Sequence, residues 1–323
     1  MFTGRSASVY GTGFKRKQIF QRALLAAIII IFLSLLPAVY FKLKARAGSG
    51  SERSDLQGLF EAHAYETAYT KCGEMLKEKP LDLFLLTMYG FSAYQLAIAQ
   101  INNSDILGYI DDCIWSLRKA MLLREGSSDG RIFYVLGKAY YYKGSGYADL
   151  AVRYLEKART AAYKAGDIPE YLGLAYAALG DYRSSVSAFS LALTEEGDGV
   201  AGTENGSSDV LLLSIAKSYL ALDEYESAKA YLIRCLDVSK DSKTLAAAGL
   251  LLGGTLLKAG DSSGAETEYL KVIEENGENA EAHYQLGELY ALGGDTTRAR
   301  SEWRRAVRID PTYGPARSRL NLQ

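Results

Sequence analysis

Histidine and cysteine are the side chains in this sequence that could act as nucleophiles, general bases or metal ligands. There are two histidines, His63 and His283, and three cysteines, Cys72, Cys113 and Cys235. The cysteines are far apart, odd in number, and form no CxxC or Cys/His spacing of the kind that holds zinc. Neither histidine has a cysteine or acid at a recognisable catalytic spacing. We therefore interpret the cysteines as small core residues and His283 as a packing residue.

Glycine-rich and acidic stretches could bind phosphates or calcium. The stretch Gly11-Thr-Gly13 lies in a basic segment with no strand before it, so it does not fit a nucleotide-binding loop. The acidic, glycine-rich residues 194–209 lack the ligand spacing of an EF-hand, which favours a solvated loop. No P-loop, HExxH or GxSxG motif is present. We predict no enzymatic activity, no cofactor and no metal site.

Charge divides the chain into two parts. Residues 1–47 contain eight lysines and arginines and no acid, which leaves a net charge of −9 for the rest of a chain whose total is −1. An acidic remainder of this size argues against general nucleic-acid binding. The composition, 48% hydrophobic and 23% charged, is that of a folded protein.

An uncharged run, from Ala23 to Phe41, is long enough to cross a bilayer as a helix. Tyr40 and Phe41, followed by Lys42 and Lys44, suit the membrane interface. The sequence therefore predicts a basic tail over 1–18, a transmembrane helix over 19–41 and a linker over 42–53.

The alternative is a cleaved signal peptide, with Ala45-Arg46-Ala47 as the cleavage site. The apolar region is longer than the usual ~7–15 residues, and cations occupy the stretch that should be neutral, so we favour an uncleaved anchor. Five cations before the run and four after it slightly favour a cytoplasmic N-terminus. With that orientation the rest of the chain lies outside the cytoplasm, in the periplasm of a bacterium.

A pattern recurs through the remainder of the chain. Its last copy contains Leu286-Gly287, Tyr290, Gly294-Asp295, Ala299 and Trp303, then Ala306 and Asp310-Pro311. The frame recurs one repeat length upstream, at Leu252-Gly253, and further copies begin at the pairs that follow. These pairs are Ile215-Ala216, Leu172-Gly173 and Leu136-Gly137, the last with two extra residues in its turn. Two earlier copies are degenerate, and the second has an enlarged turn before Cys113.

This frame closely resembles the tetratricopeptide repeat (TPR) family. The resemblance implies an all-α fold, a right-handed α-solenoid of antiparallel helix pairs, with about seven repeats over 54–313 and a C-terminal capping helix or tail over 314–323. Small residues at positions 8, 20 and 27 of each repeat let two helices approach closely. Neighbouring pairs must stack, because one pair cannot bury its apolar face alone.

The resemblance also implies a concave groove lined by the first helix of each repeat, where a peptide or amphipathic helix of a protein partner would bind. The carboxylate clamp by which some relatives hold chaperones is missing. The candidate groove residues are Phe84, Phe91, Tyr94, Arg131, Tyr134, Lys138, Tyr141, Tyr142 and Lys217. Any of the tyrosines could instead pack between repeats.

A second candidate surface is a basic C-terminal patch, whose residues are Arg298, Arg304, Arg305 and Arg308. It is either a solvated face or a contact for an acidic partner, which includes the acidic part of a neighbouring copy. We interpret the chain as a non-catalytic, membrane-anchored scaffold in assembly of a membrane or envelope complex, such as secretion or flagellar motor machinery. The alternatives are an organelle import receptor with a cytosolic repeat domain and a regulatory subunit of a membrane enzyme.

Overall fold

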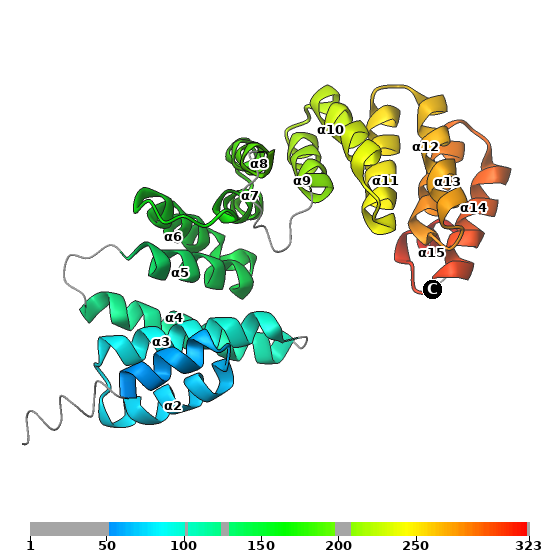
Figure 1. Ribbon diagram of the computed structural model, residues 1–323. Helices are drawn as coiled ribbons and strands as arrows, with labels where there is room; N and C mark the ends of the chain where they lie inside the picture. Colours follow the sequence, from blue (N-terminus) through cyan, green and yellow to red (C-terminus); the bar gives the residue numbers. More distant parts are fainter. Residues whose placement is uncertain (1–51, 101–102, 124–128, 198–207, 322–323) are drawn as a thin grey trace, which may run out of the picture. The chain divides into compact units, whose positions relative to one another are not determined.

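The computed structural model describes residues 52–100, 103–123, 129–197 and 208–321. Every regular element in these residues is a helix (Figure 1). The chain divides into two compact units, with the boundary between Ser92 and Ala93 inside helix α3 (Leu83–Ala99). The predicted all-α class is confirmed, whereas the predicted tail, membrane helix and nearly all of the linker lie outside the described residues.

The first unit contains a helix over 52–61, helix α2 (Tyr65–Glu78) and the beginning of α3. His63 forms the turn between the first two helices, with a positive φ of 57°. The rings of Tyr69 and Tyr89 stack with their centroids 4.5 Å apart, and Gly73 lies under the Tyr89 ring. Cys72 is fully buried in this core, as the sequence predicts.

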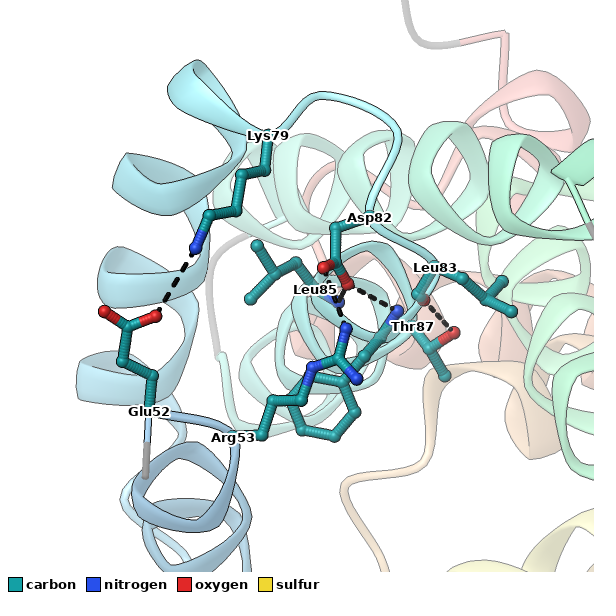
Figure 2. Close-up of polar contacts among 8 residues, drawn as sticks. Glu52, Arg53, Lys79, Asp82, Leu83, Leu85 and Thr87 are labelled. Carbon is teal, nitrogen blue, oxygen red and sulfur yellow. Dashed lines mark hydrogen bonds and ion pairs between the residues drawn. The ribbon is translucent and has the colours of Figure 1, made fainter. Parts of the chain in front are cut away.

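Polar contacts hold the start of α3 in this unit (Figure 2). The carboxylate of Asp82 accepts hydrogen bonds from the backbone N–H groups of Phe84, at 2.9 Å, and Leu85, at 3.1 Å. It also accepts one from Arg53 at 3.0 Å, while Lys79 pairs with Glu52. Partial burial opposes ionisation of Asp82, but these hydrogen bonds and the Arg53 charge hold its pKa below the usual value. Asp82 thereby caps the helix and anchors the 52–61 helix to it.

The second unit continues with antiparallel helix pairs joined by short turns (Figure 1). After α4 (Asn103–Leu123) the pairs are α5 (Gly130–Lys143) with α6 (Ala148–Thr160), α7 (Ile168–Leu179) with α8 (Tyr182–Gly197), α9 (Ser208–Ala221) with α10 (Tyr225–Val238), α11 (Ser242–Lys258) with α12 (Ser262–Glu275), and α13 (Ala280–Leu292) with α14 (Thr296–Ile309). The two extra residues in the turn after α5 form part of a short 3₁₀ helix, η1 (Ser145–Tyr147).

Glycine lets the two helices of a pair approach each other. A Cβ added to a glycine of the first helix would lie 2.4 to 2.6 Å from a large side chain of the second. The four pairs are Gly137 with Leu155, Gly173 with Phe189, Gly253 with Tyr269 and Gly287 with Trp303. The predicted small positions are also filled as expected, since Ala151, Ala228, Ala265 and Ala299 are all fully buried.

In the Gly-Asp dipeptides between helices, the glycine ends one helix and the aspartate caps the next. Gly180, Gly260 and Gly294 have positive φ values of 78°, 85° and 82°, which end the first helix of each pair in a left-handed residue. The aspartate that follows caps the second helix: Asp261 accepts from the N–H of Gly264 at 2.8 Å, and Asp295 accepts from that of Arg298 at 2.9 Å.

The second repeat departs from the prediction. An enlarged turn is predicted before Cys113, but α3 continues to Ala99 and α4 begins at Asn103. The additional residues lengthen the two helices to 17 and 21 residues, so the predicted enlarged turn is wrong. Leucine and alanine near the end of α3 are strong helix formers, which favours extension over a loop.

The short helix α15 (Gly314–Arg319) follows the last pair, in the tail for which a capping helix is predicted. Its Ala316 is buried against Ala299, Trp303 and Ala306 of α14. Among the described residues, no helix has the length and apolarity needed to cross a membrane.

Candidate partner-binding surface

Helices α5 and α7 bring several of the predicted groove residues together in one buried cluster. The ammonium of Lys138 donates a hydrogen bond to Asp167 at 2.7 Å and another to the hydroxyl of Tyr134 at 3.0 Å. It also lies 4.3 Å from the ring centre of Tyr171. We name this set the tyrosine–lysine cluster, and its members are Tyr94, Tyr134, Lys138, Tyr142, Asp167 and Tyr171.

The sequence of each helix explains how the cluster forms. Tyr134, Lys138 and Tyr142 are four residues apart, which places them on one face of α5. Asp167 is the N-cap residue of α7, yet its side chain makes no capping hydrogen bond. Its carboxylate instead accepts from the hydroxyl of Tyr134, 2.8 Å from each oxygen. The cap position therefore joins one repeat to the next.

Burial keeps three phenols of this cluster neutral. It raises the pKa of Tyr94, Tyr134 and Tyr171 far above the usual value, and the Asp167 carboxylate raises each further. The hydroxyls of Tyr142 and Tyr171 share a hydrogen bond of 2.9 Å. The hydroxyl of Tyr94 is buried and makes no hydrogen bond within the described part of the chain. The cluster thus packs four tyrosines around one buried ion pair.

The predicted groove residues differ in how much of each side chain reaches solvent. Arg131 and Lys217 are exposed, and Tyr134, Tyr141 and Tyr142 are half-buried. Lys138 is only 8% exposed, and its charge is matched inside the chain. Of the three earlier residues, Phe91 and Tyr94 are buried. Phe84, in the first unit, is half-buried beneath the guanidinium of Arg53. Whether these residues contact a partner stays a prediction.

The basic C-terminal patch lies on α14, and its arginines fall into two groups. Arg298 pairs with Asp295 at 2.6 Å, and Arg305 pairs with Glu302 at 3.0 Å. Arg304 and Arg308 are exposed and make no hydrogen bond or ion pair with any residue that the structure describes. The second group is therefore available to a partner.

Sequence reasoning missed the partner of His283. This side chain is buried, as predicted, but its Nδ1 lies 2.6 Å from a carboxylate oxygen of Glu302 on the next helix. Its Nε2 lies 3.3 Å from the carbonyl oxygen of Gly277. The contact with Glu302 joins the two helices of one repeat, a relationship that a search for catalytic spacing does not register. In the described residues, no three potential ligands lie where they could hold a metal ion.

Comparisons with known proteins agree with the helix pairs. Family models for the tetratricopeptide repeat match residues 211–242 and 250–313. A search of curated proteins found no match. The matched regions cover α9 to α14.

Many solved structures resemble the chain, among them two that cover most of it. One is the C-terminal part of a TPR repeat-containing protein from Cytophaga hutchinsonii, with 15% identity, 82% of this chain and 98% of that chain covered, and a TM-score of 0.58. The other is PilW, described as a widely conserved type IV pilus biogenesis factor, with 16% identity, 72% and 98% covered, and a TM-score of 0.54. At these identities the similarity shows the fold. Residues 211–242 and 250–313 are thus recognised as tetratricopeptide repeats, and the described residues have a TPR-type fold of antiparallel helix pairs.

Proposed function

We propose that this protein is a membrane-anchored adaptor, which holds protein partners on its repeat domain during assembly of a membrane or envelope complex. The anchor is the transmembrane helix proposed for residues 19–41. The repeat domain faces the periplasm of a bacterium and serves machinery such as a secretion system or a flagellar motor. TPR proteins bind peptides and protein partners, and in this proposal the chain is a non-catalytic adaptor.

One observation carries the proposal: a single chain joins the uncharged run from Ala23 to Phe41 to a TPR-type repeat domain. Insertion of such a run into a lipid bilayer is favourable, because each apolar residue lowers the free energy of insertion. A repeat domain offers extended surface for proteins. The two parts together make a tether with a binding surface.

The partner surface proposed here consists of Arg131, Tyr141 and Tyr142 on α5. Tyr142 is held by its hydrogen bond to Tyr171, so its ring is positioned before a partner arrives. Tyrosines held in this way give large contact area at small entropic cost. The exposed Arg131 adds a charged contact at the start of the same helix. This combination suits an amphipathic helix or an extended peptide that carries an acidic residue.

The anchor is tested by extraction of membranes with alkaline carbonate. The full chain should remain in the membrane pellet, and a variant without residues 19–41 should move to the soluble fraction. A full chain that is extracted by carbonate rules out the anchor.

Topology separates this proposal from an import receptor. A cysteine introduced at the exposed position Lys240 should react with a membrane-impermeant maleimide in intact cells if the repeat domain lies outside the cytoplasm. Labelling only after lysis would place the domain in the cytosol and favour the targeting receptor.

Partner binding is tested with a photo-crosslinking amino acid at Tyr141 in the full chain in its native membrane. The matched control carries the same amino acid at the exposed Arg183, on the second helix of the next repeat. A protein crosslinked from position 141 and not from 183 supports the proposed surface and identifies the complex. Equal products from both positions contradict it, and a membrane enzyme as the specific product favours the regulatory-subunit alternative.

A further inference from the structure

Helices α10 to α13 line a cavity of about 700 Å³ that is open to solvent on one side. Its apolar lining includes Leu245, Leu250 and Val272, which are partly or fully buried. Its acidic lining residues Glu274, Glu275 and Glu281 are exposed, which places their carboxylates at the rim. We name these residues and the apolar lining beneath them the acidic cavity.

The negative charge of the acidic cavity is only partly compensated, because its lining holds four glutamates and two lysines, Lys243 and Lys271. Glu268 in the same lining pairs with Lys271 at 2.8 Å. Glu274, Glu275 and Glu281 make no hydrogen bond or ion pair with other described residues. Glu274 and Glu275 also end α12, where the helix dipole is negative and the last turn holds no cation. This arrangement is electrostatically unfavourable in the isolated chain and favours a cation from elsewhere.

An excess of positive charge lies on the pair formed by α13 and α14. Arg300, Arg304 and Arg308 are four residues apart on α14, so they share one exposed face. None of the three is hydrogen-bonded or ion-paired within the described residues, and like charges at this spacing repel. Their neighbours Arg298 and Arg305 are paired with acids of the same helix pair. We name Arg300, Arg304 and Arg308 the arginine face.

We propose that the acidic cavity of one copy of this chain receives the arginine face of a second copy. Three exposed carboxylates meet three exposed guanidinium groups, which form strong paired hydrogen bonds with carboxylates. The aliphatic stems of the arginines cover the apolar lining of the cavity while their charged ends reach its rim. A cavity lined by carboxylates alone would suit a small cation, but the apolar lining requires a side chain with an apolar stem.

Both surfaces lie within the last two repeats of the same chain. Two copies related by a twofold axis therefore exchange both contacts at once, which is the commonest arrangement in homo-oligomers. The contact depends on charge, so it weakens with salt. This self-association requires neither the membrane anchor nor a protein partner on α5, so it can fail while the adaptor function stands.

The first test is a crosslink between copies of the full chain in detergent micelles. One population carries Glu275→Cys and the other carries Arg304→Cys, and the two are mixed and treated with a short bis-maleimide. A product of two chains should form in the mixture far more than in either population alone. Raising the salt from roughly 50 mM to roughly 500 mM should reduce the product about tenfold. A control mixture with Arg153→Cys in place of Arg304→Cys should give little product.

Charge reversal makes the test specific. The variant Arg300→Glu/Arg304→Glu/Arg308→Glu and the variant Glu274→Lys/Glu275→Lys/Glu281→Lys should each be monomeric by light scattering, and a mixture of the two should associate again. The variant Arg153→Glu/Lys164→Glu/Arg183→Glu has the same change of charge at other exposed positions and should associate as the native chain does. Restored association shows that the reversed variants are folded. A monomeric native chain overturns the proposal and leaves the cavity to a cationic segment of another protein; unchanged association of both reversed variants overturns it as well.

Discussion

The indole of Trp303 lies so close to Gly287 that a Cβ added to the glycine would be 2.6 Å from ring atoms Cδ1 and Nε1. The indole N–H is buried without a hydrogen-bond partner in the described residues, so this side chain acts through packing. Tyr269 has the same relationship to Gly253 at 2.4 Å. The glycine in the first helix thus leaves the space that a large aromatic residue of the second helix fills.

We predict that Gly287→Ala loosens the last repeat. The added methyl must displace the indole or separate α13 from α14, and overpacking of this kind costs ~1–3 kcal/mol. Amide hydrogen exchange measured by mass spectrometry should show faster exchange in α13, α14 and α15. The matched control is Gly108→Ala on α4, where an added Cβ meets no atom within 4 Å and alanine should stabilise the helix by roughly 0.5–1 kcal/mol. Unchanged exchange in α14 of the Gly287 variant contradicts the packing argument.

The sequence was sufficient to predict these close approaches, because small and large residues recur in a fixed frame. The frame also contains the Gly-Asp dipeptide, whose left-handed glycine and capping aspartate are local requirements of a tight turn. The second repeat was predicted less well. Whether the residues between Tyr94 and Cys113 form a loop or longer helices depends on packing against neighbours, which the frame does not specify.

The candidate site was predictable only in part. The frame places Lys138 on the face of α5 that lines the groove, but it does not reveal whether the charge reaches solvent. Asp167 binds that charge from 29 residues away, and at an N-cap position an aspartate ordinarily caps its own helix. The same applies to Glu302, which contacts His283 across one repeat. Side-chain pairing between helices depends on distances that one sequence does not fix.

We predict that the ion pair between Lys138 and Asp167 stabilises the junction of the third and fourth repeats. Both side chains are largely buried, at 10% and 15% exposure. Lys138→Met leaves the Asp167 carboxylate buried without its cation, and loss of one partner of a buried pair costs ~3–5 kcal/mol. The double variant Lys138→Met/Asp167→Asn should recover part of that loss, because no buried charge is left unpaired. The measurement is a double-mutant cycle on hydrogen exchange in α5 and α7, and additive effects would contradict the coupling.

Alkaline pH should weaken the same junction. Burial and the Asp167 carboxylate raise the pKa of Tyr134, and burial with the Tyr142 hydrogen bond raises that of Tyr171, far above the ordinary value of 10.0. The folded chain keeps these phenols protonated, while the unfolded chain releases their protons above about pH 10. The unfolded state therefore binds fewer protons, and the free energy of unfolding falls as pH rises beyond that point.

The measurement is local stability of α5 and α7 by hydrogen exchange between about pH 8 and pH 11, corrected for the intrinsic exchange rate. Stability should be constant below about pH 9 and should fall above pH 10. In Tyr134→Phe the decline should be shallower by up to about 1.4 kcal/mol per pH unit, because one phenol no longer titrates. An equally steep decline in this variant would exclude Tyr134 as a source of the pH dependence.

The three cysteines should be unreactive while the chain is folded. Cys72, Cys113 and Cys235 are fully buried, and burial raises the pKa of Cys72 to about 12 and that of Cys235 to about 11. The thiolate is the reactive form, so both burial and the small thiolate fraction slow attack on a disulfide reagent. At about pH 8, Ellman's reagent should label the unfolded chain at least ~100-fold faster than the native chain, because the ordinary thiol pKa is ~8.5.

Cys235 also donates to the backbone oxygen of Asp209 at 3.3 Å, at the start of the fifth repeat. If Cys235 alone reacts quickly in the native chain, α9 opens independently of its neighbours, and the packing of α9 against α10 is weaker than the buried thiol implies.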